Sequence, residues 1–134
     1  MMQRSPSIPT GTWGEIHDEC ELFFMYVLGI DAGASKTDCL LADETGTILS
    51  RSRGPGANLQ IFGEETVASV LARVIDKALS ERAATADALC VGMAGADRPR
   101  DSEAVQDILD RIGRSQRNMV TNDAVVALVA PIQS

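Results

Sequence analysis

The chain has 134 residues and a mass of 14.3 kDa, a length typical of one domain around one hydrophobic core. Its nineteen acidic residues outnumber its twelve basic ones, and the net charge of -7, with only 4% aromatic residues, argues against a nucleic-acid partner. The hydrophobic content is 45% and no apolar run reaches membrane-spanning length, so the composition indicates a globular domain without a membrane partner.

The first 24 residues contain Ser, Pro and Gly without a sustained hydrophobic period, which predicts a flexible N-terminal extension. From Met25 the pattern changes, and residues 25–134 are expected to form the folded unit. Three β-like runs open this unit, at residues 26–30, 37–42 and 48–53. The short turns between them, at residues 31–35 and 43–46, predict an antiparallel meander, and Gly46 suits a left-handed position in the second turn.

Helices and strands then alternate. Apolar residues with helical spacing predict a helix over residues 63–80, with Glu64 and Glu65 in its first turn. A continuous apolar run predicts a buried strand at 88–94, followed by a helix at 102–112 that ends at Gly113. A strand at 118–121 and a helix at 124–130, stopped by Pro131, complete the order. The expected fold class is α/β, a mixed five-stranded sheet with helices on both faces.

The turn after the first strand has the composition of a phosphate site. Asp31 ends the strand, and small residues followed by two hydroxyls and a lysine would let backbone N–H groups approach phosphate oxygens while the carboxylate holds Mg²⁺ through water. The spacing is neither that of a P-loop nor that of a G-x-G-x-x-G dinucleotide motif. An ordinary β-turn remains the alternative. The candidate phosphate-binding residues are Gly33, Ala34, Ser35, Lys36 and Thr37.

Three further polar positions follow predicted strands. Asn58 lies in the loop GPGAN and Gly95 in the loop MAGAD, and both loops are suited to close contact with sugar hydroxyls. Asp123 begins the last helix, where it could be an N-cap, an acceptor for a substrate hydroxyl, or both.

The cysteines and the histidine exclude several chemistries. Cys20, Cys39 and Cys90 are too scattered for a disulfide framework or a Cys-x-x-Cys site, so reduced thiols in the cytoplasm are expected. His17 is the sole histidine, which removes zinc hydrolase and Ser-His-Asp mechanisms.

Four motifs in chain order, GIDAGASKTD, GPGAN, MAGAD and VTNDA, resemble those of sugar kinases in the acetate kinase, heat-shock chaperone and actin superfamily. They are most similar to the N-acetylglucosamine kinase and BadF/BadG-type ATPase group, over residues 26–130. The resemblance implies a ribonuclease-H-like, actin-type ATPase lobe. Ser35 replaces the usual Thr of the first phosphate loop but keeps its hydroxyl.

The resemblance also implies roles for individual residues. Asp31 would orient Mg²⁺, the turn from Gly33 would hold ATP phosphates, and Asn58 and Gly95 would contact an amino sugar. Asp123 would bind the sugar hydroxyl and act as the catalytic base. The implied reaction transfers the γ-phosphoryl group of ATP to a hydroxyl of N-acetylglucosamine or glucosamine.

Family members have a second lobe with another phosphate loop and the adenosine pocket, and no such segment follows Asp123. We therefore expect an N-terminal lobe that is inactive as the isolated 134-residue chain and that needs a C-terminal lobe or associates with itself. Two alternatives stay open: a nucleotide-switch ATPase of the acyl-CoA dehydratase or reductase activator type, and a non-catalytic remnant that binds a sugar or a partner. The kinase interpretation requires the carboxylates of Asp31 and Asp123 to project from neighbouring parallel strand ends into one cleft.

Overall fold

The computed structural model describes residues 25–80, 82–96 and 98–121. The predicted N-terminal extension, the predicted helix 124–130 and Asp123 lie outside these residues. The elements in chain order are β1 (Tyr26–Ala32), β2 (Lys36–Asp43), β3 (Ile48–Pro55), α2 (Leu59–Leu79), β4 (Ala88–Met93), α3 (Pro99–Ile112) and β5 (Asn118–Thr121). None of these helices is long and apolar enough to cross a membrane.

The five strands form one mixed sheet in the order β3-β2-β1-β4-β5. The strands β1, β2 and β3 are antiparallel neighbours, which confirms the predicted meander, and Gly46 has a φ of 88° in its second turn. The strand β4 lies parallel to both β1 and β5. The predicted α/β class and the mixed five-stranded sheet are therefore confirmed.

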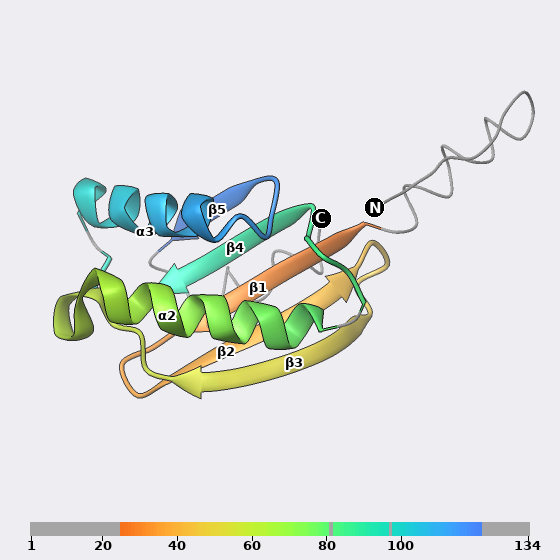
Figure 1. Cartoon of the computed structure of the whole chain (residues 1–134), viewed down its shortest axis with the longest axis horizontal. Coiled ribbons are helices and arrows are strands. Elements are labelled where there is room, and N and C mark those ends of the chain that lie inside the picture. The colour runs from red at the N-terminus through yellow and green to blue at the C-terminus, as the bar shows by residue number, and fades with distance from the viewer. Residues whose placement is uncertain (1–24, 81, 97, 122–134) are drawn as a thin grey trace, which may run out of the picture.

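Both described helices cover the same face of the sheet, as Figure 1 shows, with α2 over β2 and β3 and α3 over β5. They also contact each other, so the core lies between one helical layer and the sheet. Alternate residues of the strands face this core because side chains of a strand point to opposite faces in turn. Leu28 and Ile30 of β1 meet Leu71 and Ile75 of α2 there, and all four are fully buried.

Small side chains on β3 allow α2 to approach closely. The hydroxyls of Ser50 and Ser52 donate hydrogen bonds to the main-chain oxygens of Ala78 and Val74 in α2, the second over 2.6 Å. A Cβ atom on Gly54 would lie 2.9 Å from Cγ1 of Val74. The edge strand β3 thus presents small side chains to α2, and two of them form hydrogen bonds with the helix.

Both helices begin earlier than predicted. Asn58 caps α2, which places the first turn before Gly63, and Gly63 itself has non-helical angles within the element. The prediction that Glu64 and Glu65 occupy the first turn is therefore wrong. The helix α3 begins at Pro99, a residue suited to the first helical position, and ends at Gly113 as predicted.

Candidate functional site

Three loops that the sequence analysis selected meet at one edge of the sheet. The strands β1, β3 and β4 all run toward this edge, where β1 turns into β2, β3 leads to α2 and β4 leads to α3 (Figure 1, left). The carboxyl edge of parallel strands is where open α/β sheets bind their ligands. The topology therefore brings the predicted phosphate turn and both predicted sugar loops together.

The phosphate turn and the GPGAN loop are held together by main-chain contacts. The Ala57 N–H donates to the Gly33 oxygen over 2.9 Å. A Cβ atom on Gly56 would stand 2.0 Å from the Ala34 oxygen, so only glycine permits this approach. The loop after β3 thus packs against the phosphate turn and holds it in place.

The residues of the phosphate turn differ in their surroundings. The Gly33 N–H donates to the Lys36 oxygen over 2.9 Å, which closes the hairpin. Ala34, Ser35 and Lys36 are exposed, so their polar groups can meet a ligand. Thr37 is fully buried and its hydroxyl donates to the Pro55 oxygen over 2.8 Å. In this structure Thr37 stabilises the loop, and its contact with phosphate stays a prediction.

Asn58 and Gly95 lie against each other, as expected for two parts of one sugar site. Oδ1 of Asn58 accepts from the N–H groups of Gln60 and Ile61 over 2.9 and 3.1 Å, as the cap of α2. A Cβ atom on Gly95 would lie 2.6 Å from this same Oδ1, and the φ of Gly95 is 86°. The carbonyl side of the Asn58 amide is thus engaged, and its NH₂ group remains the group suited to donate to a sugar oxygen.

Asp31 is half-buried near the end of β1, on the sheet face opposite the helices. Its register partners are Asp38 on β2 and Gly92 on β4, and Gly92 in turn pairs with Thr121 on β5. Because Gly92 has no side chain, no β4 side chain stands between Asp31 and Thr121 in this row of the sheet. Opposite residues of an antiparallel pair have Cβ atoms about 5 Å apart, so Asp38 brings a second carboxylate close to Asp31.

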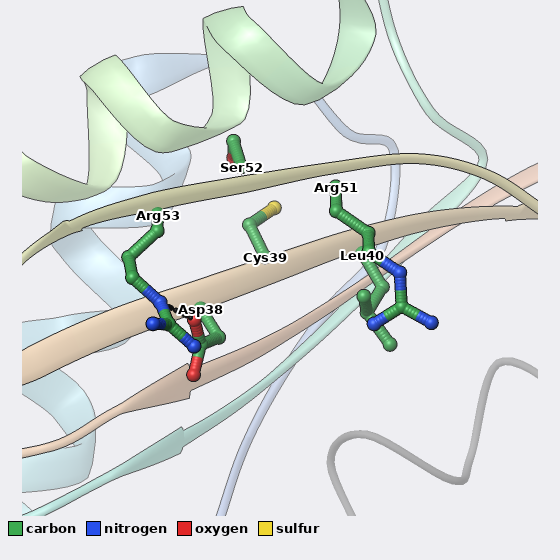
Figure 2. A pocket seen from close by; sticks show the side chains of 6 residues that line it. All are labelled: Asp38, Cys39, Leu40, Arg51, Ser52 and Arg53. Carbon is green, nitrogen blue, oxygen red and sulfur yellow. Dashed lines mark hydrogen bonds and ion pairs between the residues drawn. The ribbon is translucent and has the colours of Figure 1, made fainter.

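The charge of Asp38 is balanced by Arg53 of β3. Nε of Arg53 lies 2.6 Å from Oδ1 of Asp38, and both line a hollow of about 380 Å³ on the β2–β3 ribbon (Figure 2). Figure 2 also shows Ser52 and Cys39 pointing to the helical side of this ribbon, while Arg51 points away from it.

The oxygen atoms of Asp31 suit Mg²⁺, which binds few carboxylates and keeps several waters. No group of three His, Cys, Asp or Glu side chains that could enclose a metal occurs among the described residues. The donor set therefore fits a magnesium ion held through water, with Asp31 as the protein's contribution. Such an ion would neutralise charge on phosphates bound beside the exposed turn.

The expected placement of Asp123 needs one correction. It was predicted to follow a strand next to β1, but β4 lies between β1 and β5. The ends of β1 and β5 are thus about 10 Å apart on the same edge. Asp123 itself lies outside the described residues, so its shared cleft with Asp31 stays a prediction.

Several residues at this edge were missed by sequence reasoning. Asp38 lies beside Asp31 only because of strand register, which the sequence pattern does not specify. Gln60 donates through Nε2 to the Gly95 oxygen over 3.1 Å, across 35 residues of chain. Asp101, 6% exposed, could have been identified as the third residue of a helix that begins with proline.

The thiols bear on the nucleotide-switch alternative, because activators of that type resemble this group but hold an iron–sulfur cluster through cysteines. Cys39 faces the core between sheet and helices, and Cys90 lies on β4 between core-facing residues, on the opposite face. Burial raises the pKa of Cys39 to about 12, and it also raises the pKa of Cys90. Two buried thiols on opposite faces cannot ligate one cluster.

The fold and the three joined loops define an α/β lobe whose candidate ligand site lies at the carboxyl edge of its sheet. The chain belongs to the BadF/BadG/BcrA/BcrD ATPase family, whose family model matches residues 28–132.

Two curated relatives are sugar kinases. The chain is 33% identical over 112 residues to the N-acetylmuramic acid/N-acetylglucosamine kinase of Clostridium acetobutylicum, covering 81% of this chain and 36% of that protein. It is 28% identical over 117 residues to the N-acetyl-D-glucosamine kinase of Dictyostelium discoideum, covering 79% of this chain and 37% of that protein. The chain thus spans little more than a third of the length of these relatives.

Solved structures support the fold. The crystal structure of a provisionally named N-acetylglucosamine kinase from Chromobacterium violaceum superposes with a TM-score of 0.61 at 19% identity. The match covers 79% of this chain and 38% of that chain. It supports the α/β fold of this chain.

Proposed function

We propose that this chain carries the phosphate- and sugar-binding part of an ATP-dependent amino-sugar kinase that acts in the cytoplasm. One observation supports this most directly: the phosphate turn, the Asn58 loop and the Gly95 loop are joined at one edge of the sheet. The substrate would be N-acetylglucosamine or glucosamine, since both curated relatives are kinases named for N-acetylated amino sugars.

In the proposed reaction a sugar hydroxyl attacks the γ-phosphorus of ATP. A bond forms between the hydroxyl oxygen and phosphorus, the bond to the bridging oxygen of ADP breaks, and the hydroxyl proton passes to Asp123. The exposed turn at Ala34 and Ser35 would hold phosphate oxygens, Asp31 would hold Mg²⁺ through water, and Asn58 would orient the sugar. Alignment is what phosphoryl transfer chiefly requires, because the leaving phosphate carries much of the chemistry.

The test is sugar binding by the 134-residue chain, measured by calorimetry with N-acetylglucosamine. Asn58→Asp keeps an oxygen that caps α2 but removes the NH₂ donor, so stability should be retained while affinity falls about three- to tenfold. Asn58→Ala removes the cap as well and should also cost about 1 kcal/mol of unfolding free energy. Unchanged sugar affinity in both variants, or no binding by the wild-type chain, would refute the proposal.

The nucleotide-switch ATPase is the second candidate, because the family to which the chain belongs includes ATPases by name. The placement of Cys39 and Cys90 argues against the iron–sulfur chemistry of such activators in this part of the chain. Iron content and visible absorption of the purified protein would distinguish the two candidates.

A further inference from the structure

Gln60 touches three separate parts of the candidate sugar site. Its main-chain N–H donates to Oδ1 of Asn58 over 2.9 Å, and its side-chain Nε2 donates to the Gly95 oxygen over 3.1 Å. The same side chain lies at one hollow with Asp101 of α3 and helps to lower the pKa of that carboxyl. One residue in the first turn of α2 thus links the loop after β3 to the loop after β4, beside the first turn of α3.

The chemistry of these partners requires an amide at position 60. The Gly95 carbonyl and the ionised Asp101 carboxylate are both acceptors, and the NH₂ group of glutamine supplies two donors from one atom. An ionised glutamate would supply none, and a leucine of similar size would supply none. The acceptors also fix which end of the Gln60 amide faces them.

The carboxylate of Asp101, beside Gln60, is held in place by Arg98. Oδ2 of Asp101 accepts from the main-chain N–H of Arg98 over 3.3 Å and from Nε of Arg98 over 3.1 Å. Burial acts to raise the pKa of Asp101, but these bonds, the Arg98 charge and the Gln60 side chain outweigh it and hold the pKa below the usual value. Asp101 is therefore an ionised acceptor at neutral pH.

The Ala94 N–H at the start of the Gly95 loop donates to the Ala32 oxygen over 2.9 Å, but the loop's other main-chain hydrogen bonds are long. The Leu59 N–H reaches the Ala94 oxygen over 3.4 Å and the Ala96 N–H reaches the Met93 oxygen over 3.3 Å, both at the long end of hydrogen-bond distances. A hollow of about 470 Å³ lies beside Gln60, between the first turns of α2 and α3. The Gln60 side chain thus has room to leave the loop, so its hydrogen bonds rather than packing keep it in place.

We propose that Gln60 is a positioning residue that holds the Gly95 loop against Asn58, so that the sugar site is formed before the sugar binds. This inference rests on the proposed function, because it assigns Asn58 and Gly95 to the sugar. A site that is already formed spares the ligand the free energy of ordering the loop. Loss of the link should therefore weaken sugar binding without removing any group that touches the sugar.

The experiment compares the wild-type chain with Gln60→Leu and Gln60→Glu, by calorimetry with N-acetylglucosamine and by amide hydrogen exchange of ¹⁵N-labelled protein. Gln60→Leu should weaken sugar binding about three- to tenfold at every pH and speed exchange at Gly95 and Ala96. Gln106→Leu and Gln106→Glu on α3 are the matched controls, because Gln106 lies outside the site, and they should leave both readouts unchanged.

Gln60→Glu gives a pH signature that loss of packing would not produce. At about pH 7 the new carboxylate should bind sugar as poorly as the leucine variant. Beside Asp101 its pKa should be raised above the usual value of about 4.3, so at about pH 5 the protonated acid can donate one bond to the Gly95 oxygen. At about pH 5 the sugar affinity of Gln60→Glu should therefore approach that of wild type, whereas the affinity of Gln60→Leu should stay low.

The outcomes separate the two proposals. If the wild-type chain binds the sugar and both Gln60 variants bind it within twofold, with unchanged exchange at Gly95, the role of Gln60 is overturned while the proposed function stands. If the wild-type chain binds no amino sugar, the proposed function is overturned together with the positioning role that rests on it.

Discussion

At the scale of single residues, Gly95 shows how closely the two sugar loops approach. Its φ of 86° and the 2.6 Å between its Cβ position and Oδ1 of Asn58 leave no room for a side chain. Gly95→Ala should cost about 1–2 kcal/mol of unfolding free energy for the left-handed backbone and a further 1–3 kcal/mol, roughly, for the contact. Urea unfolding measures the loss.

Gly113→Ala is the matched control for this prediction. Gly113 has a φ of 69°, but the nearest atom to its Cβ position is 3.8 Å away, so this variant should bear the backbone cost alone. Sugar binding should fall in Gly95→Ala and stay unchanged in Gly113→Ala. Equal losses of stability and affinity in the two variants would contradict the close contact with Asn58.

At the scale of elements, the contact between β3 and α2 depends on small residues. A methyl group at Gly54 would lie 2.9 Å from Cγ1 of Val74, so Gly54→Ala should cost about 1–3 kcal/mol by overpacking. Shortening Val74 to alanine should relieve the clash, so the double variant should lose less than the sum of the two single losses. Urea unfolding of the four proteins measures this coupling, and strict additivity would show that the two positions are independent.

The turn between β2 and β3 predicts a pH dependence. The Thr45 hydroxyl donates to Oδ1 of Asp43 over 2.6 Å, and this bond, aided by the N–H groups of Thr45 and Thr47, lowers the pKa of the Asp43 carboxyl. A carboxyl with a lowered folded-state pKa stabilises the protein above its usual pKa of about 3.9, and this stabilisation is lost as the pH falls through the folded-state value.

Wild type should therefore be more stable than Asp43→Asn at about pH 7, and the difference should be smaller at about pH 2.5, because protonation of Asp43 removes the charge that the turn stabilises. Urea midpoints at the two pH values measure the difference. Asp107→Asn, on an exposed position of α3, controls for the loss of one negative charge. A difference of the same size at low pH would mean that the charge of Asp43 does not contribute to the turn.

At the scale of the whole molecule, the described residues offer one candidate phosphate turn, whereas the family resemblance implies a second phosphate loop in another lobe. Positioning of the γ-phosphate from both sides underlies the rate of phosphoryl transfer. We therefore predict that the 134-residue chain binds N-acetylglucosamine but shows no turnover above background in a coupled ADP-release assay. Robust turnover would show that these residues make a complete active site.

Local patterns in the sequence predicted the elements and the composition of the site. Alternating or continuous apolar runs identified the five described strands, and apolar residues with helical spacing identified α2 and α3. A strand or helix that buries one face must repeat apolar residues at its own period, whichever element it packs against. Small and polar residues after strands selected the candidate phosphate turn and the two candidate sugar loops, which the structure brings together. The starts of both helices were misplaced, because a cap on Asn58 and a proline at position 99 outweigh the apolar period.

The tertiary structure decided which groups remain available for chemistry. The register of β1 and β2 placed Asp38 beside Asp31, and β4 lies between β1 and β5. Packing of the loops buried Thr37, and the cap of α2 uses the side-chain oxygen of Asn58 as a hydrogen-bond acceptor. These outcomes depend on contacts between residues distant in the chain, which local periodicity does not encode. The amino-acid sequence by itself therefore determined which kinds of groups reach the site, and three-dimensional packing determined which of their atoms are free to bind.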